Sequence, residues 1–337
     1  MKTILVTGGA GYIGSHLVVE LLQQNYEVVV VDNLSTSNKK SLDNIKKITK
    51  KDFKFYQCDI KDIDAMNKVF KENDIDAVVH FAAYSLVGES MTTPLKYYDN
   101  NIYGTKCLLE SMIENNVKKI VFSSTAAVYG EPKQVPILES NKTEPTNTYG
   151  ETKLAIEKMM SWCDKAYGVK YVALRYFNAC GAHPTGLIGE NHNPESHLIP
   201  IILQVPNGKR EFISVFGDDY DTKDGTCVRD YIHVCDLADA HILAVNYLLD
   251  GNESNVFNLG NGVGFSVKEV ITETEKVVGK PISSKMDGRR AGDPATLTAS
   301  SKKAQEVLGW KPKMNDLNQI IATAWNWHKN HKNGFED

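Results

Sequence analysis

Short β-rich runs alternate with helical segments through the first half of the chain. The runs are rich in Val, Ile, Phe and Tyr and lie at 3–7, 26–32, 53–59, 77–83, 118–124 and 170–176; helical candidates lie near 12–24, 39–50, 62–73, 95–115 and 149–167. Strands that alternate with helices of this length predict βαβ units and a parallel sheet. The uninterrupted apolar residues at 28–31 fit a strand that is covered on both faces.

A glycine-rich turn follows the first of these runs. Glycines stand at 8, 11 and 14, directly after a predicted strand and at the start of an amphipathic helix. In this context Gly8 permits a tight turn, Gly11 lets backbone amides approach a pyrophosphate, and Gly14 allows close helix–strand packing. The helix N-terminus then offers amide donors to the phosphates. The pattern predicts a dinucleotide site in an α/β fold with a Rossmann-type doubly wound parallel sheet.

Acidic residues close the next two strands. Asp32 follows Gly14 by eighteen positions, where a carboxylate hydrogen-bonds the adenosine ribose and repels a 2′-phosphate. This position favours NAD over NADP as the cofactor. Asp59 ends the third strand, and we predict that it meets the adenine edge.

The chain changes character near residue 180. Gly, Pro and Asn cluster over 180–200, and the helix–strand alternation becomes irregular. We predict an NAD-binding domain over residues 1–179 and a smaller C-terminal α/β substrate-binding domain over 180–337, which folds over the ligand edge of the sheet. The boundary is interleaved, because residues 229–249 predict a helix and 255–262 a strand. Segments near 230–262 would therefore return to the first domain.

Composition and charge exclude several classes of protein. The chain has 337 residues, of which 42% are hydrophobic and 24% charged, as in an ordinary soluble globular protein. A net charge of −4 gives no basic footprint for nucleic acid, and the apolar runs are too short to span a bilayer. The first apolar run stops at a glycine pair, unlike a signal peptide. We expect a cytoplasmic protein without nucleic-acid or membrane partners.

Cysteine and histidine spacing predicts neither disulfides nor a metal. The six cysteines are scattered with no Cys-x-x-Cys pair, so reduced thiols are expected. His183, His192 and His197 fall in one Gly/Pro/Asn-rich stretch, but their spacing is irregular and carboxylates at helical offsets are lacking. We therefore expect no metal site.

Tyr149 and Lys153 are four positions apart on a predicted helix that ends at Gly168, so their side chains stack on one face. Lowering the pKa of a tyrosine from about 10 to about 7 requires roughly 4 kcal/mol. A cation ~6 Å away supplies roughly 3 kcal/mol at an effective dielectric of about 20. Lys153 and the positive nicotinamide ring of NAD would together make Tyr149 a base for a substrate hydroxyl. Taken alone, the pair also fits two surface residues; the glycine-rich turn favours catalysis.

Longer motifs connect the chain to a known family. The spacing Gly-x-x-Gly-x-x-Gly, together with "NTYGETK" at 147–153, resembles the extended short-chain dehydrogenase/reductase family. Within it, the chain is similar over nearly its whole length to the branch that inverts C4 of UDP-glucose and UDP-galactose; the motifs are "HFAAYSLVGES", "DNNIYGT", "SSTAAVYG", "LRYFNACGAHPTG", "DGTCVRDYIHV" and "RRAGDP". The resemblance implies an isomerase of galactose metabolism. Tyr149 would take the 4-hydroxyl proton while C4 gives its hydride to NAD, and the 4-keto sugar would regain the hydride on its opposite face.

The resemblance also implies which residues contact the cofactor. These would be Gly8, Gly11, Tyr12, Ile13, Gly14, Asp32, Asn33, Ser35, Thr36, Asp59, Ile60, Phe81, Ala82, Ala83, Asn100, Ser123, Tyr149, Lys153 and Tyr176. Ser85 stands where the family commonly has Lys, so the cation that would reach the cofactor phosphates there is missing.

On the substrate side, the guanidinium groups of Arg229 and Arg290 are suited to fork onto a diphosphate. By resemblance, Phe216 would stack on uracil and Asp293 would meet the uridine ribose, and Thr125 would bond the reacting hydroxyl and relay its proton. Further contacts implied in the same way are Asn178, His197, Leu198 and Val215. Leu297 stands where some members carry a large aromatic residue that limits the sugar pocket, so we predict that N-acetylated UDP-sugars are also accepted.

Two other functions stay open at this point. A sugar-nucleotide dehydratase or decarboxylase of the same family is one; dehydratases carry an acidic pair after the active-site Thr, and this chain has Ala126 and Ala127 there. A non-catalytic dinucleotide-sensing protein is the other, and it could dispense with Tyr149 and Lys153.

The family commonly forms homodimers in which two helices of the nucleotide domain build a four-helix bundle. The segments 95–115 and 149–167 are the candidates here, and we expect a homodimer.

Overall fold

The computed structural model describes residues 1–290 and 293–336. Its first sheet runs in the order β10-β6-β5-β4-β1-β2-β3, and every neighbouring pair in it is parallel. The strands are β1 (Thr3–Thr7), β2 (Glu27–Val31), β3 (Lys54–Tyr56), β4 (Ala77–His80), β5 (Lys119–Thr125), β6 (Lys170–Tyr176) and β10 (Asn255–Leu259). The predicted α/β fold with a doubly wound parallel sheet is confirmed.

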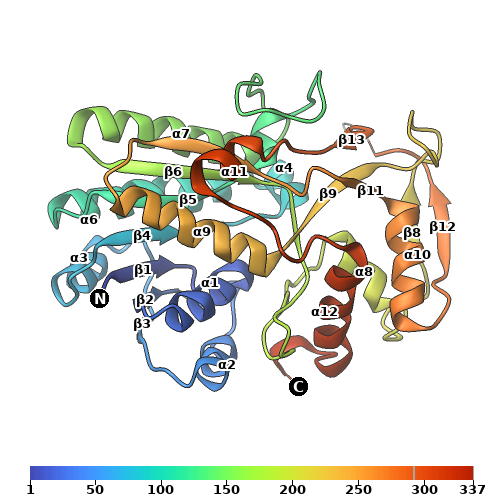
Figure 1. Cartoon of the computed structure of the whole chain (residues 1–337), viewed down its shortest axis with the longest axis horizontal. Helices are drawn as coiled ribbons and strands as arrows, with labels where there is room; N and C mark the ends of the chain where they lie inside the picture. The colour runs from blue at the N-terminus through green and yellow to red at the C-terminus, as the bar shows by residue number, and fades with distance from the viewer. Residues whose placement is uncertain (291–292, 337) are drawn as a thin grey trace.

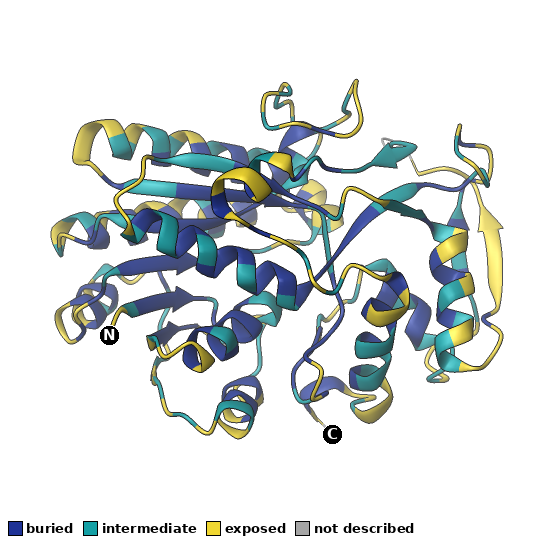
Figure 2. Cartoon of the chain, viewed as in Figure 1, coloured by how far each residue is buried: buried dark blue, intermediate teal, exposed yellow. Residues whose placement is uncertain are grey.

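Helices cover both faces of this sheet. Successive strand residues point to opposite sides, so each face carries apolar side chains that a layer of helices can bury. Ile4, Val6 and Val30 pack with the helices of one face, and Leu5 and Val29 with those of the other. The first face carries α1 (Tyr12–Gln23), α2 (Lys40–Thr49) and α9 (Val234–Leu249), and the second α3 (Ile63–Lys71), α6 (Gly104–Glu114) and α7 (Thr148–Tyr167). Figure 1 shows α1 and α9 crossing in front of the strands, and Figure 2 shows that the strands in the middle of the sheet are largely buried.

Most predicted elements lie where the sequence placed them, with two differences. The helix predicted over 229–249 was wrong in its first residues: β9 (Val228–His233) occupies them, and α9 begins only at Val234. The helix predicted over 95–115 is divided into α5 (Pro94–Tyr97), a π-helical segment η1 (Tyr98–Tyr103) and α6. Two short helices were not predicted, namely α4 (Val87–Thr92) and the 3₁₀ turn η2 (Ala126–Tyr129).

The remainder of the chain forms a second, smaller body. One sheet contains β7 (Asn178–Cys180), β9, β11 (Gly264–Ser266) and β13 (Thr296–Leu297), and another pairs β8 (Ile213–Phe216) with β12 (Ser284–Asp287). The helices are α8 (Leu198–Gln204), α10 (Val267–Val278) and α12 (Leu317–Asn330), followed by the turn η3 (Gly334–Glu336), whereas α11 (Lys302–Leu308) returns to pack against β10 of the first sheet. Side chains of α8, α10 and α12 share one apolar core.

The division into two domains stays a prediction. It is supported by two elements that follow β9 in the chain but lie with the first sheet. β10 pairs with β6, and α9 packs against α1, so both lie with the first sheet although they follow β9. We propose an interleaved boundary with one change from the prediction: β9, most of which fell among the segments expected to return to the first domain, belongs to the smaller body because it pairs with β7 and β11.

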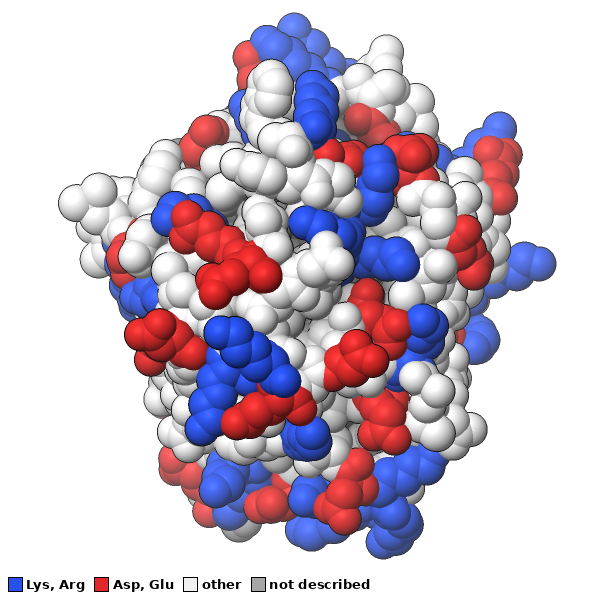
Figure 3. Space-filling view, turned by 90° about the vertical axis from the view of Figure 1, so that its left-hand side faces the viewer, with Lys and Arg blue, Asp and Glu red and all other residues white. Residues whose placement is uncertain are grey.

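On the face drawn in Figure 3, Lys and Arg side chains are interspersed with Asp and Glu. Among the residues described, no helix combines the length and apolar character needed to cross a bilayer.

A buried ion pair joins α7 to the middle of the sheet. Glu157 on α7 accepts hydrogen bonds from Arg175 Nε (2.9 Å) and Nη2 (2.5 Å) and from Ser124 Oγ (2.5 Å). Arg175 Nη1 also donates to the Tyr129 hydroxyl at 2.9 Å. The Arg175 and Glu157 side chains are only 7% and 6% exposed. The pair therefore fixes the helix that carries Tyr149 and Lys153 against β5 and β6.

Glu157→Ala should destabilise the protein by about 3–5 kcal/mol, because it leaves a buried guanidinium without its counter-charge. The free energy of unfolding in urea measures the loss. Lys158→Ala, at the next and exposed position of the same helix, should change it by less than about 0.5 kcal/mol. Equal effects of the two substitutions would contradict this role of Glu157.

Candidate active site

The glycine-rich turn lies at the point where the strand order of the first sheet reverses. β1 has β2 on one side and β4 on the other, and ligands of doubly wound sheets bind at this position. Gly8 has a φ of +72°, which favours glycine, and a Cβ on Gly14 would lie 2.2 Å from the Gly8 carbonyl oxygen. A Cβ on Gly11 would meet only that oxygen, at 3.2 Å. The turn is therefore closely packed at Gly8 and Gly14, whereas Gly11 has space beside it. A pyrophosphate could approach the backbone amides at Gly11.

Two carboxylates flank this turn. Asp32, 7% exposed, follows β2 and accepts hydrogen bonds from the Ala10 amide (3.0 Å), the Leu34 amide (2.9 Å) and Ser37 Oγ (2.8 Å). Asp59 follows β3 and accepts from Asn33 Nδ2 at 3.0 Å. The first carboxylate is thus held against the glycine-rich turn, and the second lies beside the loop that follows Asp32. Both fit the ribose and adenine ends of a dinucleotide.

The other residues predicted to contact the cofactor come mainly from the carboxyl ends of the same parallel strands. Phe81, Ala82 and Ala83 follow β4, while Ser123 near the end of β5 hydrogen-bonds the Tyr176 hydroxyl at the end of β6. Asn100 lies on η1. Their individual contacts stay predictions, but the fold brings them to one edge of the sheet.

Tyr149 and Lys153 lie one turn apart at the start of α7, as predicted. Asn147 caps this helix through a hydrogen bond from the Gly150 amide (2.8 Å), which sets the position of Tyr149. Lys153 Nζ lies 5.8 Å from the centroid of the Tyr149 ring and donates to the Ser123 carbonyl oxygen at 2.7 Å. Tyr149 also hydrogen-bonds Thr125 at the end of β5. The sequence thus correctly predicted that these side chains meet.

Burial changes the proton affinities of this pair. It raises the pKa of Tyr149 to about 12, and the hydrogen bond with Thr125 offsets only part of that rise. Burial also lowers the pKa of Lys153 to about 7, against an opposing effect of Glu157. Burial therefore opposes the charged forms of both side chains. A further positive charge beside the phenol is required to make it a base.

A pocket of about 360 Å³ lies in the smaller body, between β7, β8, β9 and the start of α8. Arg229 forms an ion pair with Asp293, and the Arg290 guanidinium lies 3.8 Å from the centroid of the Phe216 ring. The pocket therefore offers two guanidinium groups and an aromatic ring on one wall. Seven residues predicted to contact substrate line it: Asn178, His197, Leu198, Phe216, Arg229, Arg290 and Asp293.

The remaining predicted substrate residues lie elsewhere. Val215 is buried in β8 and does not line the pocket. Leu297 on β13 packs beside Val128 and Leu154 and pairs with Arg229 of β9, while Thr125 is the last residue of β5. Sequence reasoning missed Ser196, Arg210 and Tyr231, which also line the pocket. Tyr231 lies inside a quoted motif, whereas Arg210 stands among other surface charges and carried no signal.

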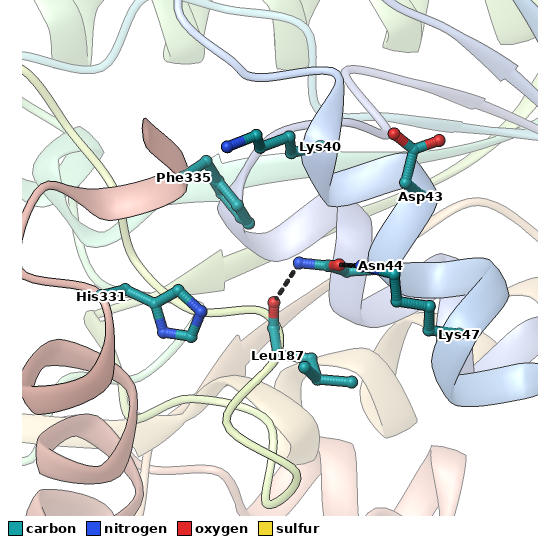
Figure 4. A pocket seen from close by; sticks show the side chains of 7 residues that line it. All are labelled: Lys40, Asp43, Asn44, Lys47, Leu187, His331 and Phe335. Atoms are coloured by element: carbon teal, nitrogen blue, oxygen red, sulfur yellow. Dashed lines mark hydrogen bonds between the residues drawn. The ribbon is translucent and has the colours of Figure 1, made fainter. Parts of the chain in front are cut away.

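A second pocket, of about 300 Å³, lies between α2 and the C-terminal segment (Figure 4). Its floor is closed by a hydrogen bond from Asn44 Nδ2 to the Leu187 carbonyl oxygen at 2.8 Å. It contains none of the predicted site residues; the lining is Lys40, Asp43, Asn44, Lys47, Leu187, His331 and Phe335.

Known proteins share this sequence and fold. A family model described as GDP-mannose 4,6 dehydratase matches residues 5–323. The UDP-glucose 4-epimerase of Halalkalibacterium halodurans is 58% identical over 332 residues, which are 98% of this chain and 97% of that protein. The chain belongs to the UDP-glucose 4-epimerase family.

Solved structures of this family superpose over nearly the whole chain. The UDP-glucose 4-epimerase from Bifidobacterium longum, in complex with NAD+ and UDP, has a TM-score of 0.93 and 44% identity, covering 99% of this chain and 100% of that one. The UDP-Glc/GlcNAc 4-epimerase from Campylobacter jejuni has a TM-score of 0.87 and 43% identity, covering 98% of this chain and 100% of that one. The resemblance inferred from the motifs is confirmed.

Gly14→Ala should abolish stable NAD binding, because its Cβ would push the Gly8 carbonyl into the space required by the cofactor. We expect at least a tenfold loss of NAD retained through purification, measured by absorbance of the released nucleotide. Gly88→Ala is the matched control, since a Cβ there meets nothing within 4 Å. Full NAD content in the Gly14 variant would show that the close approach is not needed.

Proposed function

We propose that this protein interconverts UDP-glucose and UDP-galactose by inverting C4 of the hexose through a 4-keto sugar. The observation that carries the proposal is the half-buried Tyr149, hydrogen-bonded to Thr125 and followed one turn later by the buried Lys153, at the sheet edge that holds the glycine-rich turn. An alcohol and a hydride acceptor can meet there away from water. The pocket wall that carries Arg229 and Arg290 suits the diphosphate of a nucleotide sugar.

The residues of the chain divide the work. Tyr149 removes the proton of the 4-hydroxyl, and Thr125 lies within hydrogen-bonding reach to orient that hydroxyl and relay the proton. Lys153, held by the Ser123 carbonyl, places its amino group beside the phenol. NAD, when bound, supplies a positively charged ring that takes up the C4 hydride and returns it.

The pocket holds the nucleotide and leaves the sugar free. Arg229 is fixed by Asp293, so its remaining donors can bind a phosphate oxygen. Phe216, backed by Arg290, offers a flat surface to uracil. Because these contacts involve the UDP part alone, the keto sugar can turn over and present its other face to the same hydride.

A dehydratase is disfavoured, although the matched family model bears that name. The positions after Thr125 are Ala126 and Ala127 in the turn η2, and neither can act as the acid for eliminating a hydroxyl. A non-catalytic sensor would have no need of a buried Tyr–Lys pair.

Tyr149→Phe should lower kcat for the conversion of UDP-galactose to UDP-glucose by about 10²–10⁴-fold, because the general base is lost. The assay uses purified protein without added NAD. Tyr167→Phe, at the exposed end of the same helix, should leave the rate unchanged. A Tyr149→Phe enzyme as fast as the parent would overturn the mechanism. A keto-deoxy product would indicate the dehydratase instead, and no product from the parent would indicate the sensor.

Leu297 is proposed to admit N-acetylated sugars. Leu297→Tyr should lower kcat/KM for UDP-N-acetylgalactosamine by about tenfold or more while sparing UDP-galactose, since the added ring narrows the sugar end of the site. Val263→Tyr, at an exposed position, is the control. Equal losses on both sugars would contradict a steric gate.

We also propose a homodimer. Leu95 (80% exposed), Tyr103 (47%) and Trp162 (68%) leave an apolar surface over α5, η1 and α7, which contact one another. Sedimentation velocity should show a single species of twice the chain mass; a monomer at micromolar concentration would contradict the assignment.

A further inference from the structure

Four metal-ligating side chains converge in the loop between β7 and α8. Glu190, His192, Glu195 and His197 each offer one donor atom, and these atoms all lie within 4.8 Å of one another. The sequence predicted no metal here because the histidines are irregularly spaced and carboxylates at helical offsets were judged lacking, although His192 and Glu195 are three positions apart. A loop has no such periodicity, and this one folds two glutamates onto the two histidines.

The distances match the edges of a small coordination polyhedron. His197 Nδ1 lies 2.7 Å from Glu190 Oε1 and 3.1 Å from Glu195 Oε1. His192 Nδ1 lies 3.1 Å from Glu190 Oε1 and 3.9 Å from Glu195 Oε2. Ligands about 2.0–2.1 Å from a tetrahedral ion are about 3.3–3.4 Å apart, which is inside the observed range. Small side-chain adjustments would place an ion at the centre.

We propose that Glu190, His192, Glu195 and His197 bind one divalent first-row transition metal, with Zn²⁺ as the ion of choice. Two imidazole nitrogens and two carboxylate oxygens form a donor set that zinc accepts in tetrahedral geometry. The glutamate side chains are 3% and 8% exposed, and those of His192 and His197 are 25% and 39% exposed. The carboxylates are thus held inside, while the imidazole side leaves an entry path.

The surrounding structure holds the ligands in place. The Glu190 carbonyl oxygen accepts a hydrogen bond from Trp327 Nε1 of α12 at 2.9 Å. Glu195 Oε1 accepts the amides of Ser196 (2.7 Å) and His197 (2.8 Å). The His192 ring meets Tyr12 of α1 edge-on, with centroids 6.2 Å apart. The cluster therefore joins the loop to both bodies of the protein.

The metal would influence the substrate pocket by fixing the positions of the residues that line it. Ser196, His197 and Leu198 line that pocket, and α8 begins immediately after the ligand His197. An ion that ties His197 to Glu190 would fix this wall. This consequence, unlike the metal site itself, rests on the proposed UDP-sugar function.

Untagged protein, treated with EDTA and dialysed, should bind one Zn²⁺ per chain by isothermal titration and gain several degrees in Tm. Co²⁺ in the same protein should give the intense visible bands of a tetrahedral site. His192→Asn, which keeps a hydrogen-bond donor but no imidazole, and Glu195→Gln should each weaken Zn²⁺ binding by tenfold or more. His183→Asn changes a histidine of the same loop that lies outside the cluster, and should bind as the parent does.

The proposal fails if the parent binds no stoichiometric Zn²⁺, which would leave the cluster a set of ion pairs, or if His183→Asn weakens binding as much as His192→Asn. Should His192→Asn not fold, Glu195→Gln and the Co²⁺ spectrum of the parent decide. A KM for UDP-galactose that rises several-fold after EDTA and recovers with Zn²⁺ supports the positioning role. If KM does not change although Zn²⁺ binds stoichiometrically, the positioning role of the metal is wrong. The metal site and the proposed epimerase function would both remain.

Discussion

The common direction of the strands in the first sheet is the constraint on which the site depends. Because all neighbouring pairs are parallel, the carboxyl ends of β1, β2, β4, β5 and β6 reach the same edge. Loops that leave this edge bring together the glycine-rich turn, Asp32, Ser123 and Thr125, which are far apart in the sequence. The helix α7 then needs only a cap at Asn147 to set Tyr149 above them. An antiparallel sheet would distribute the same residues over two edges.

Burial of side chains at this edge of the sheet has two opposing effects on charged groups. Burial makes charged forms of Tyr149 and Lys153 costly, so neither is in its reactive form by virtue of the chain alone. The same low dielectric strengthens any charge that is brought in with a ligand. In the proposed mechanism, a positive charge brought in with a ligand would therefore favour the ionised form of the Tyr149 phenol. Glu157 contributes from behind, since it is buried with Arg175 and favours the charged form of Lys153.

The sequence was most informative where local pattern and fold agree. Apolar runs and glycine spacing predicted the first sheet, its helices and the Tyr149–Lys153 contact, because these depend on short-range periodicity. The boundary between β9 and α9 was misplaced because 228–233 is a buried strand whose residues carry no strict alternation. Motif resemblance named seven of the residues that line the pocket in the smaller body, but Arg210 and Ser196 reach this pocket only through the three-dimensional path of their loops. The Glu190–His197 cluster was missed for the same reason.

The path of the chain between the two bodies limits how the molecule can move. After β6 the chain enters the smaller body at β7, returns through α9 and β10, leaves again to β11, and comes back with α11 against β10 (Figure 1). Each passage is a covalent strut between the two bodies. A hinge motion that moved the two bodies far apart would have to bend the chain at all of these crossings at once. The crossings therefore oppose a large domain opening. The keto sugar would then have to rotate within the pocket while the two bodies keep their relative positions.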